Sequence, residues 1–347
     1  MKYQSGYAFT LLLLLAGCGG GGGSSSDSGT TQLNLAVSDA PVDSAQQVCI
    51  AVSGLSLKQE GVTDEKTWGP LSLIDTDDND GCLPDGYTIP TDENGHPTFF
   101  YLDLLQYQNG AKHALLSGAV IPSGHYEQLR LQVEDGRTSY LDVTTGADPK
   151  YPASYVKDAD GNILPLEVPS SEVKLHSFTA PVAGVLDYQV EFNLRHAMVL
   201  PGHETYYKLK PNGVDLIDVD VLSTISGTVD ATNTANCNGD LSKAGVYAYN
   251  STADVTALQG IDYDTDHNGP VLSTLVSHDV TTDVYSYQIN YVEAGSYKLA
   301  LVCNASDDFL TEAGNASGYA LVVADPVKDV QVQDPAVSGT TTVTENF

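Results

Sequence analysis

The chain is poor in positive charge. Its 347 residues contain 15 Lys and Arg against 45 Asp and Glu, a formal net charge of −30. After residue 225 the cations are only Lys243, Lys298 and Lys328. Repulsion from such a surface opposes binding to nucleic acid or to anionic lipid, so the sequence argues against both partners. Acidity alone identifies no ligand: it is typical of a well-solvated surface, and a cation is the partner that such a surface holds most easily.

The signatures of common enzymes are also missing. There is no G-x-S-x-G elbow and no G-x-x-x-x-G-K-[ST] loop, and the HETYY segment at His203 lacks the second histidine of a zinc-protease helix. No C-x-x-C or C-x-x-C-H pair occurs, which argues against thiolate metal sites and c-type haem. Pairs of Asp and Glu can hydrolyse glycosides. With 45 acidic residues, however, pairs are expected by chance, so their presence does not indicate a hydrolase. The sequence therefore predicts a protein that is not an enzyme.

Apolar runs of membrane-spanning length, roughly 20 residues, are absent as well. The stretch from Ala8 to Ala16 follows Lys2 and is typical of a signal-peptide core. Leu15-Ala16-Gly17-Cys18 resembles the bacterial lipobox, in which the cysteine receives diacylglycerol and palmitate and becomes the mature N-terminus. The resemblance implies a signal peptide over residues 1–17 and an outer-membrane anchor, since Gly19 stands where Asp would retain the protein. The Gly- and Ser-rich residues from 18 to 31 predict a flexible tether. An ordinary cleaved signal is the alternative.

The remaining cysteines are even in number. Setting Cys18 aside leaves Cys49, Cys82, Cys237 and Cys303, in a compartment that permits disulfides. Three pairings are possible in principle. Because two cysteines lie in each half of the chain, we expect Cys49–Cys82 and Cys237–Cys303. The chain-entropy model gives each bridge roughly 3.5 to 4.5 kcal/mol.

Helical periodicity is nearly absent. The best short candidate for a helix is Lys112 to Leu116. Alternation of apolar and polar residues recurs instead, as at Leu33, Leu35 and Val37, between frequent turn sequences. This pattern predicts an all-β fold of two tandem antiparallel β-sandwiches, immunoglobulin-like or transthyretin-like, over residues 32–222 and 223–347. The junction near Leu222 has no Gly- or Pro-rich linker, so we expect the two domains to be closely coupled.

Several ordered segments carry a family resemblance. They are LNLAVSDAPVDSAQQVCIAVSGLSL from Leu33, SGAVIPSGHYEQLRLQV from Ser117, LPLEVPSS from Leu164, VEFNLRHAMVL from Val190 and YYKLKPNGVDLID from Tyr206. Together, over about residues 32–221, they resemble the bacterial lipoprotein domain known as domain of unknown function 4382. The resemblance implies a secreted β-sandwich and no particular activity. Residues 223–347, with AGVYAYN and YVEAGSYKLALVC, are loosely similar to transthyretin-like and carboxypeptidase-regulatory-like sandwiches.

Two aspartate-rich loops resemble calcium loops, in which oxygen ligands alternate along the chain and a glycine permits the turn. In the second loop Asp264, Asp266, Asn268 and Gly269 occupy positions one, three, five and six, but Leu275 replaces the closing Glu. The first loop has Asp80 at the glycine position and Gly86 at position twelve. The candidate Ca²⁺ ligands are Asp262, Asp264, Asp266 and Asn268, with Asp75, Asp77 and Asn79 as a weaker set. An acidic surface turn is the alternative for both loops, and Ca²⁺ is the one cofactor that the sequence suggests.

Three further features have structural interpretations. Asp39, before Pro41, is expected to form an Asx turn, and Arg195 is expected to pair with a neighbouring carboxylate rather than to bind an anion. The twenty tyrosines and Trp68 could offer a sugar-stacking platform, but such residues more often pack in the core.

Taken together, these features favour a lipid-anchored cell-envelope protein, facing the periplasm or the outside, that acts as a non-catalytic binding or structural module stabilised by calcium. Its partners would be the membrane, through the anchor, and an unknown envelope or extracellular ligand. The alternative is an envelope hydrolase acting on carbohydrate or peptide with an Asp/Glu site. A convergent cleft of carboxylates with raised pKa values would favour the hydrolase, whereas flat faces and exposed aromatic residues would favour binding.

Overall fold

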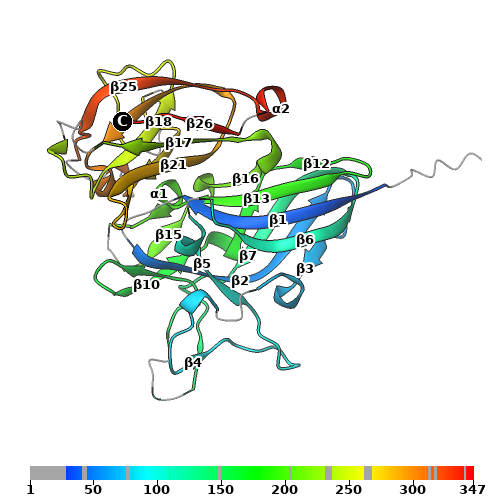
Figure 1. Ribbon diagram of the computed structural model, residues 1–347. Coiled ribbons are helices and arrows are strands. Elements are labelled where there is room, and N and C mark those ends of the chain that lie inside the picture. Colours follow the sequence, from blue (N-terminus) through cyan, green and yellow to red (C-terminus); the bar gives the residue numbers. More distant parts are fainter. Residues whose placement is uncertain are drawn as a thin grey trace, which may run out of the picture.

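The computed structural model describes residues 29–347, except residues 41–44, 76–78, 109, 145, 147–149, 203–204, 231–236, 262–267, 309, 312–313, 316–318 and 340. Strands dominate the described residues and form two stacked bodies (Figure 1). We call the described residues up to 222 the first unit and those from 223 the second unit. Within the described part of the chain, no helix is long and apolar enough to cross a membrane.

The first unit contains two large sheets. The smaller has four strands in the order β16 (Val214–Asp218), β13 (Val185–Asn193), β1 (Thr30–Ala40) and β6 (His113–Pro122). The larger has ten strands, with a main path of β11 (Glu172–Leu175), β7 (Gly124–Val133), β2 (Ala45–Gln59), β9 (Tyr155–Asp158), β10 (Ile163–Glu167), β15 (Tyr207–Leu209) and β14 (Met198–Val199). Off this path, β12 (Phe178–Ala180) pairs with β7, and β3 (Lys66–Trp68) and β5 (Phe100–Asp103) pair with β2.

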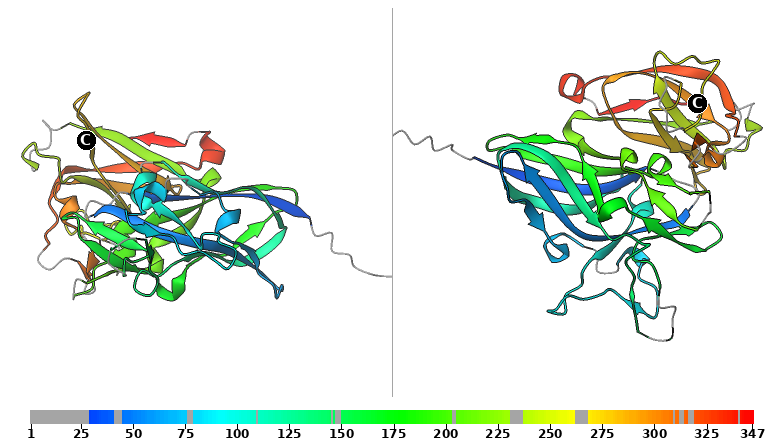
Figure 2. Two further views of the ribbon diagram at one scale, coloured as in Figure 1. Left: turned by 90° about the horizontal axis from the view of Figure 1, so that it is seen from below. Right: turned by 180° about the vertical axis from the view of Figure 1, so that it is seen from behind.

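Short elements complete the first unit. The strands β4 (Tyr87–Thr88) and β8 (Asp142–Val143) form an arm on the side away from the second unit (Figures 1 and 2). The α-helix described in the first unit is α1 (Leu194–Ala197), which lies at the boundary between the units (Figure 1). Single 3₁₀ turns are η1 (Pro70–Ser72), η2 (Asn79–Gly81), η3 (Leu104–Tyr107), η4 (Pro169–Ser171), η5 (Pro211–Gly213) and η6 (Val219–Val221).

Strand β1 shows why the alternating pattern produces a sandwich. Leu33, Leu35 and Val37 are at most 1% exposed and point into the core between the two sheets. The residues between them point to the other face, where Ser38 lies beside Glu191 of β13. β1 and β13 are parallel, so the sheet is mixed rather than purely antiparallel. A parallel pair needs a long crossover, and the chain between β1 and β13 supplies it by building most of the larger sheet.

The prediction of a helix at Lys112 to Leu116 is wrong, because strand β6 begins at His113 and includes the rest of this segment. Leu116 pairs with Leu35 of β1, and Leu115 is fully buried. A helix of about five residues is far below the length that is stable by itself, whereas the ladder to β1 satisfies the backbone hydrogen bonds here.

The second unit has two four-stranded sheets. One has the order β20 (Ser277–Asp279), β21 (Val284–Val292), β17 (Ser223–Val229) and β26 (Thr342–Thr344). The other has the order β19 (Leu272–Leu275), β18 (Gly245–Asn250), β22 (Gly295–Val302) and β25 (Val323–Val332). The strands β23 (Leu310–Thr311) and β24 (Gly314–Asn315), the turn η9 (Ala305–Asp307) and the helix α2 (Pro335–Ser338) complete the described elements. The fold is therefore all-β in both units.

Each unit has its own core and its own disulfide. One buried cluster spans Leu33 to Val214 and another spans Ile225 to Val332. Cys49 is bonded to Cys82 and Cys237 to Cys303, the pairs expected from the sequence. A third cluster joins the units, because Val199 of the first unit packs with residues of the second, Tyr247 and Tyr249 among them. The units therefore meet through apolar side chains as well as through the continuous chain.

Candidate functional site

The structure describes only some of the residues suggested as sites by the sequence. Cys18, Asp77, Asp262, Asp264 and Asp266 lie outside the described residues. Lipidation of Cys18 and most of the second calcium loop therefore stay predictions. Among the described residues no group of three or more His, Cys, Asp or Glu side chains is placed to hold a metal ion.

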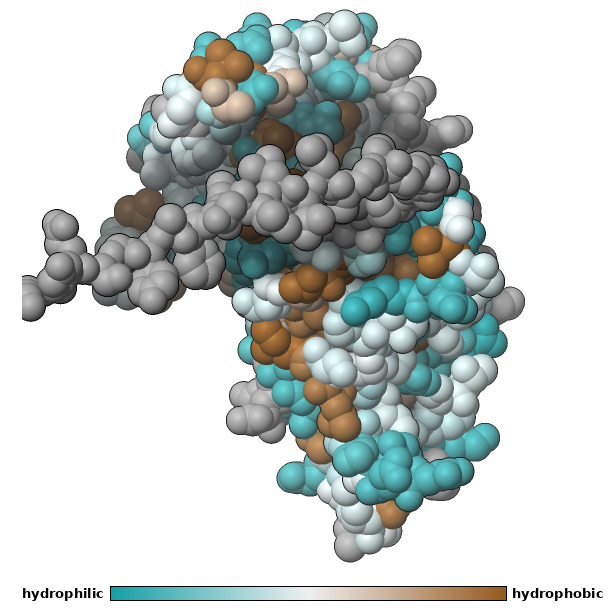
Figure 3. All heavy atoms as spheres, turned by 90° about the vertical axis from the view of Figure 1, so that its right-hand side faces the viewer, coloured by the Kyte–Doolittle hydropathy of each residue, from teal (hydrophilic) through white to brown (hydrophobic). Residues whose placement is uncertain are grey.

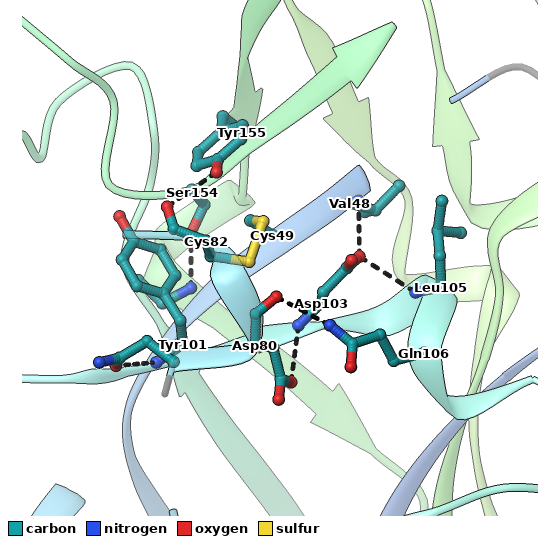
Figure 4. Close-up of a disulfide and its surroundings, with 12 residues drawn as sticks. Val48, Cys49, Asp80, Cys82, Tyr101, Asp103, Leu105, Gln106, Ser154 and Tyr155 are labelled. Atoms are coloured by element: carbon teal, nitrogen blue, oxygen red, sulfur yellow. Dashed lines mark hydrogen bonds between the residues drawn. A yellow bond between two sulfur atoms is a disulfide. The ribbon is translucent and has the colours of Figure 1, made fainter. Parts of the chain in front are cut away.

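The first acidic loop is tied into the protein beside the Cys49–Cys82 disulfide (Figure 4). Asp80 adopts a left-handed φ of 52°, as the glycine of a calcium loop would, but its Oδ2 accepts hydrogen bonds from the Asp103 N–H at 3.0 Å and the Tyr107 hydroxyl at 2.7 Å. Asn79 Oδ1 accepts from the Tyr101 N–H at 3.4 Å, and Asp75 is exposed. In this loop the described oxygens of Asn79 and Asp80 therefore serve the protein's own donors and hold the turn against β5.

Asn268, the candidate Ca²⁺ ligand of the second loop that the structure describes, also accepts hydrogen bonds from the protein. Asn268 Oδ1 accepts a hydrogen bond from the Asp254 N–H at 3.0 Å, and the Asn268 carbonyl accepts from the Gln259 N–H at 2.9 Å. The hydrogen bond from Asp254 engages one of the two lone pairs of the Asn268 amide oxygen and leaves the other for a ligand such as Ca²⁺.

The most developed site is one that the sequence did not reveal: a cleft of about 780 Å³ between the two units. The first unit contributes acidic and amide side chains from β1, β13 and β16 and from the start of α1, and the second unit contributes β19, β21 and the turn after β21. The polar residues that matter below are Asp39, Glu191, Asn193, His196, Asp215, Asp218, Ser273, Thr274 and Glu293. None of the described residues that line the cleft is Lys or Arg.

Glu191 lies at the centre of a hydrogen-bond network that crosses between the units. Its Oε2 accepts from the Ser38 hydroxyl and, at 3.5 Å, from Gln189 Nε2. The same Gln189 amide donates to Ser38 and to the hydroxyl of Tyr291 in the second unit. Burial raises the pKa of Glu191 to about 7 against the two hydrogen bonds that lower it, and the nearby Asp215 adds to the rise. Glu191 is therefore a carboxyl group that titrates near neutral pH.

Asp39 is a second buried carboxyl group, not the expected Asx turn. Its Oδ2 accepts from Gln108 Nε2 at 2.9 Å, and the side chain is only 3% exposed. Burial holds its pKa well above the usual range, and repulsion from Glu191 adds to the rise. The β1–β13 register pairs Ser38 with Glu191, so Asp39 and Glu191 stand on opposite faces of the sheet.

Several lining groups are buried without a hydrogen-bond partner among the described residues. These atoms are Asn193 Oδ1, His196 Nε2, Ser273 Oγ and Thr274 Oγ1. Ser273 is 5% and Thr274 1% exposed. Burial and the adjacent Arg195 lower the pKa of His196 to about 4, so its ring is neutral at pH 7. Buried polar groups are nearly always paired, so a group of unpaired ones around one cleft indicates a binding site.

Arg195 links the units beside this cleft. It lies in α1 rather than on a strand, is 5% exposed, and its Nη2 donates to the Tyr247 hydroxyl at 2.8 Å, to the Ala305 carbonyl, and to the Asp308 carbonyl at 3.1 Å. Tyr247 in turn donates to Asp308 Oδ2 at 2.7 Å. The simple ion pair expected for Arg195 is replaced by a buried network in the second unit.

The surface offers little for aromatic recognition. Among the exposed large apolar side chains of the described residues, Tyr140 is the aromatic one, and the others are Val, Leu and Ile. Figure 3 shows short strips of apolar side chains on the first unit, bordered by polar ones. Among the described residues, the exposed large apolar side chains therefore form no aromatic platform of the kind considered from the sequence.

The fold and the cleft together define a class. The protein is all-β, with two sandwich units that each contain one disulfide. Between the units lies an acidic cleft in which several buried polar atoms have no hydrogen-bond partner among the described residues. The chain belongs to the family described as Domain of unknown function (DUF4382), whose family model matches residues 30–211. The resemblance seen in the sequence over about residues 32–221 is thereby confirmed. No curated protein matches the sequence.

Solved structures give only distant similarities. The major pilin subunit BcpA of Bacillus cereus is 8% identical, with 92% of this chain and 69% of that chain covered, at a TM-score of 0.19. A family CBM26 module of Amy13K from Eubacterium rectale, solved with maltoheptaose, is 12% identical, with 90% and 92% covered, at 0.18. A putative cell adhesion protein of Bacteroides fragilis is 10% identical, with 91% of each chain covered, at 0.19. Scores this low carry no argument about function, which must rest on this chain's own residues.

Proposed function

We propose that this protein is a lipid-anchored, non-catalytic binding module of the bacterial cell envelope and that its ligand occupies the cleft between the units. The observation that carries the proposal is the set of unpaired buried atoms around the cleft, Ser273 Oγ above all. A buried hydroxyl without a partner costs about 1–3 kcal/mol, and a bound ligand would recover that cost. We also propose that the units are separate domains, 32–222 and 223–347, which their separate cores support.

The test of this proposal is a pull-down from the native envelope with and without a blocked cleft. Val271 lines the cleft and is 38% exposed, so Val271→Trp is expected to fill the cleft without disturbing either core. Val280→Trp, at an 83% exposed position of the second unit outside the cleft lining, is the matched control. We expect an envelope component that the wild type and Val280→Trp retain and Val271→Trp loses. Equal recovery with all three proteins would contradict binding in the cleft.

An envelope hydrolase acting on carbohydrate or peptide is the second candidate, because the cleft contains the carboxyl groups with raised pKa values that would favour it. Glu191, whose pKa lies near 7, is the group suited to act as a general acid. Its placement argues against this role, since Asp39 stands on the opposite face of the sheet and both carboxyl groups accept hydrogen bonds from the protein. Hydrolysis of an envelope glycan or peptide that Glu191→Gln abolishes would favour the hydrolase.

The anchor is tested at Cys18. Replacing Cys18 with Ser is expected to leave an uncleaved or mislocalised precursor, because the thiol is the only side chain to which the diacylglycerol can attach. The mature wild type and a Ser25→Ala variant of the same tether should both partition into detergent. Mass spectrometry that finds an unmodified Cys18 in the mature protein would refute the anchor.

A further inference from the structure

The lining of the cleft is acidic on both of its sides. Glu191, Asp215 and Asp218 come from the first unit and Glu293 from the second. No Lys or Arg stands among the described lining residues to balance them, and the whole chain carries a formal charge of −30. Like charges in a partly desolvated cleft repel one another, so an anionic ligand is disfavoured and a cationic one relieves the repulsion.

The unpaired atoms of the cleft accept hydrogen bonds. Asn193 Oδ1 is purely an acceptor, and the hydroxyls of Ser273 and Thr274 each have two lone pairs. The neutral ring of His196 accepts at whichever nitrogen lacks the proton. Ser273 pairs with Tyr247 and faces the boundary between the units, whereas Thr274 pairs with Val246 and faces the core of the second unit. Ser273 is at least nine-tenths buried, so bulk water does not readily satisfy its hydroxyl. These neutral groups are an observation independent of the acidic charge, and they call for a ligand rich in donors.

We propose that the cleft binds an organic cation through its primary ammonium group, with the carboxylates balancing the charge and Asn193 and Ser273 accepting its N–H donors. An ammonium group has three donors and no acceptor, which matches a lining rich in acceptors and without Lys or Arg among the described residues. Of the described lining histidines, His176 alone contacts a carboxylate, with its Nε2 at 3.0 Å from Asp215 Oδ1. The volume of about 780 Å³ lies within the range of small-ligand clefts, roughly 300–1,000 Å³. This inference rests on the proposed function, because it names the ligand class of the same cleft.

Two sources can present this chemistry, a free polyamine or the lysine side chain of a peptide. We would titrate the protein by calorimetry, in about 0.15 M salt to screen distant surface charges, with spermidine, with trilysine and with acetylated trilysine. Saturable binding at one site is expected for spermidine or for trilysine, and the tighter of the two identifies the source. Acetylation, which removes the charge, should abolish the binding of trilysine.

The variants locate the site. Asp215→Asn removes one exposed carboxylate of the cleft and Ser273→Ala removes one unpaired hydroxyl, and we expect each to weaken binding, the former about tenfold. Asp142→Asn, in the β4–β8 arm outside the cleft lining, makes the same charge change and should leave the affinity unaltered.

Four outcomes would overturn the inference. Equal weakening by Asp142→Asn and Asp215→Asn would mean diffuse attraction to an acidic surface. Equal binding of maltotriose, a neutral polyol, would mean that charge does not select the ligand. If both amines fail while the envelope pull-down still shows a cleft-dependent component, the ligand class is wrong and the binding module stands. If the pull-down also fails, the proposed function falls with it.

Discussion

Replacing Arg195 with Met is expected to lower the free energy of unfolding by about 3–5 kcal/mol, because it leaves a buried polar network in the second unit without its cation. The guanidinium donates to the Tyr247 hydroxyl and to the carbonyls of Ala305 and Asp308, all of which would lose a donor in a buried site. The Asp308 carboxylate, held by Tyr247, would also lose the positive charge closest to its network. The loss should appear as uncoupling of the two units.

Trp68, the single tryptophan, makes the uncoupling measurable because it lies in the first unit. In the wild type we expect urea unfolding followed by Trp68 fluorescence and by circular dichroism to coincide. In Arg195→Met the two curves should separate, since each unit has its own core. Arg137→Met is the matched control: this exposed arginine pairs with Glu167 at 2.6 Å, Glu167 keeps Lys208 as a second partner at 3.0 Å, and the variant should change stability by about 1 kcal/mol or less. A loss of the same size in both variants would contradict a role for Arg195 at the boundary.

Replacing Glu191 with Gln is expected to stabilise the protein by about 3 kcal/mol above pH 7 and to have no effect near pH 4. Burial raises the pKa of Glu191 from 4.5 to about 7, so between these values the folded state binds more protons than the unfolded state. Stability therefore falls as the pH rises through this window. Glutamine keeps the size and an acceptor for Ser38, and it carries no charge at any pH.

The other titrating groups of the cleft do not obscure this test. The pKa of His196 is lowered to about 4, so its contribution is lost as the pH falls from about 6.5 toward 4, in the wild type and the variant alike. Burial, the largest cause, raises the pKa of Asp39 in both proteins, and the smaller repulsion from Glu191 is lost in the variant, which stabilises the variant further at high pH. The measurement is the free energy of unfolding in urea from pH 4 to 9, with Glu93→Gln in an exposed turn as the control, which should follow the wild-type profile. A Glu191→Gln profile parallel to that of the wild type would show that Glu191 has the same pKa in the folded and unfolded states, which would contradict the prediction.

Local alternation predicted the strands, because the direction of a side chain in a strand depends only on whether its position is odd or even. Leu33, Leu35 and Val37 therefore point inward in the structure as they do in the pattern. Such patterns say little about which strands pair, and the parallel neighbours β1 and β13 depend on a crossover of more than a hundred residues. The prediction of a short helix at Lys112 was wrong for a related reason: this segment is a strand because it pairs with β1, which is distant in the sequence.

Composition and order thus determined, by themselves, that the protein is acidic, all-β and a member of its family, and that its cysteines divide between two halves. Only the tertiary structure decided that Glu191, His196 and Ser273 meet at one cleft and that Arg195 reaches into the second unit. Whether a serine hydroxyl is satisfied, or a glutamate titrates near pH 7, depends on the donors, charges and solvent that packing places around it. Those surroundings come from segments far apart in the chain, and no local pattern records them.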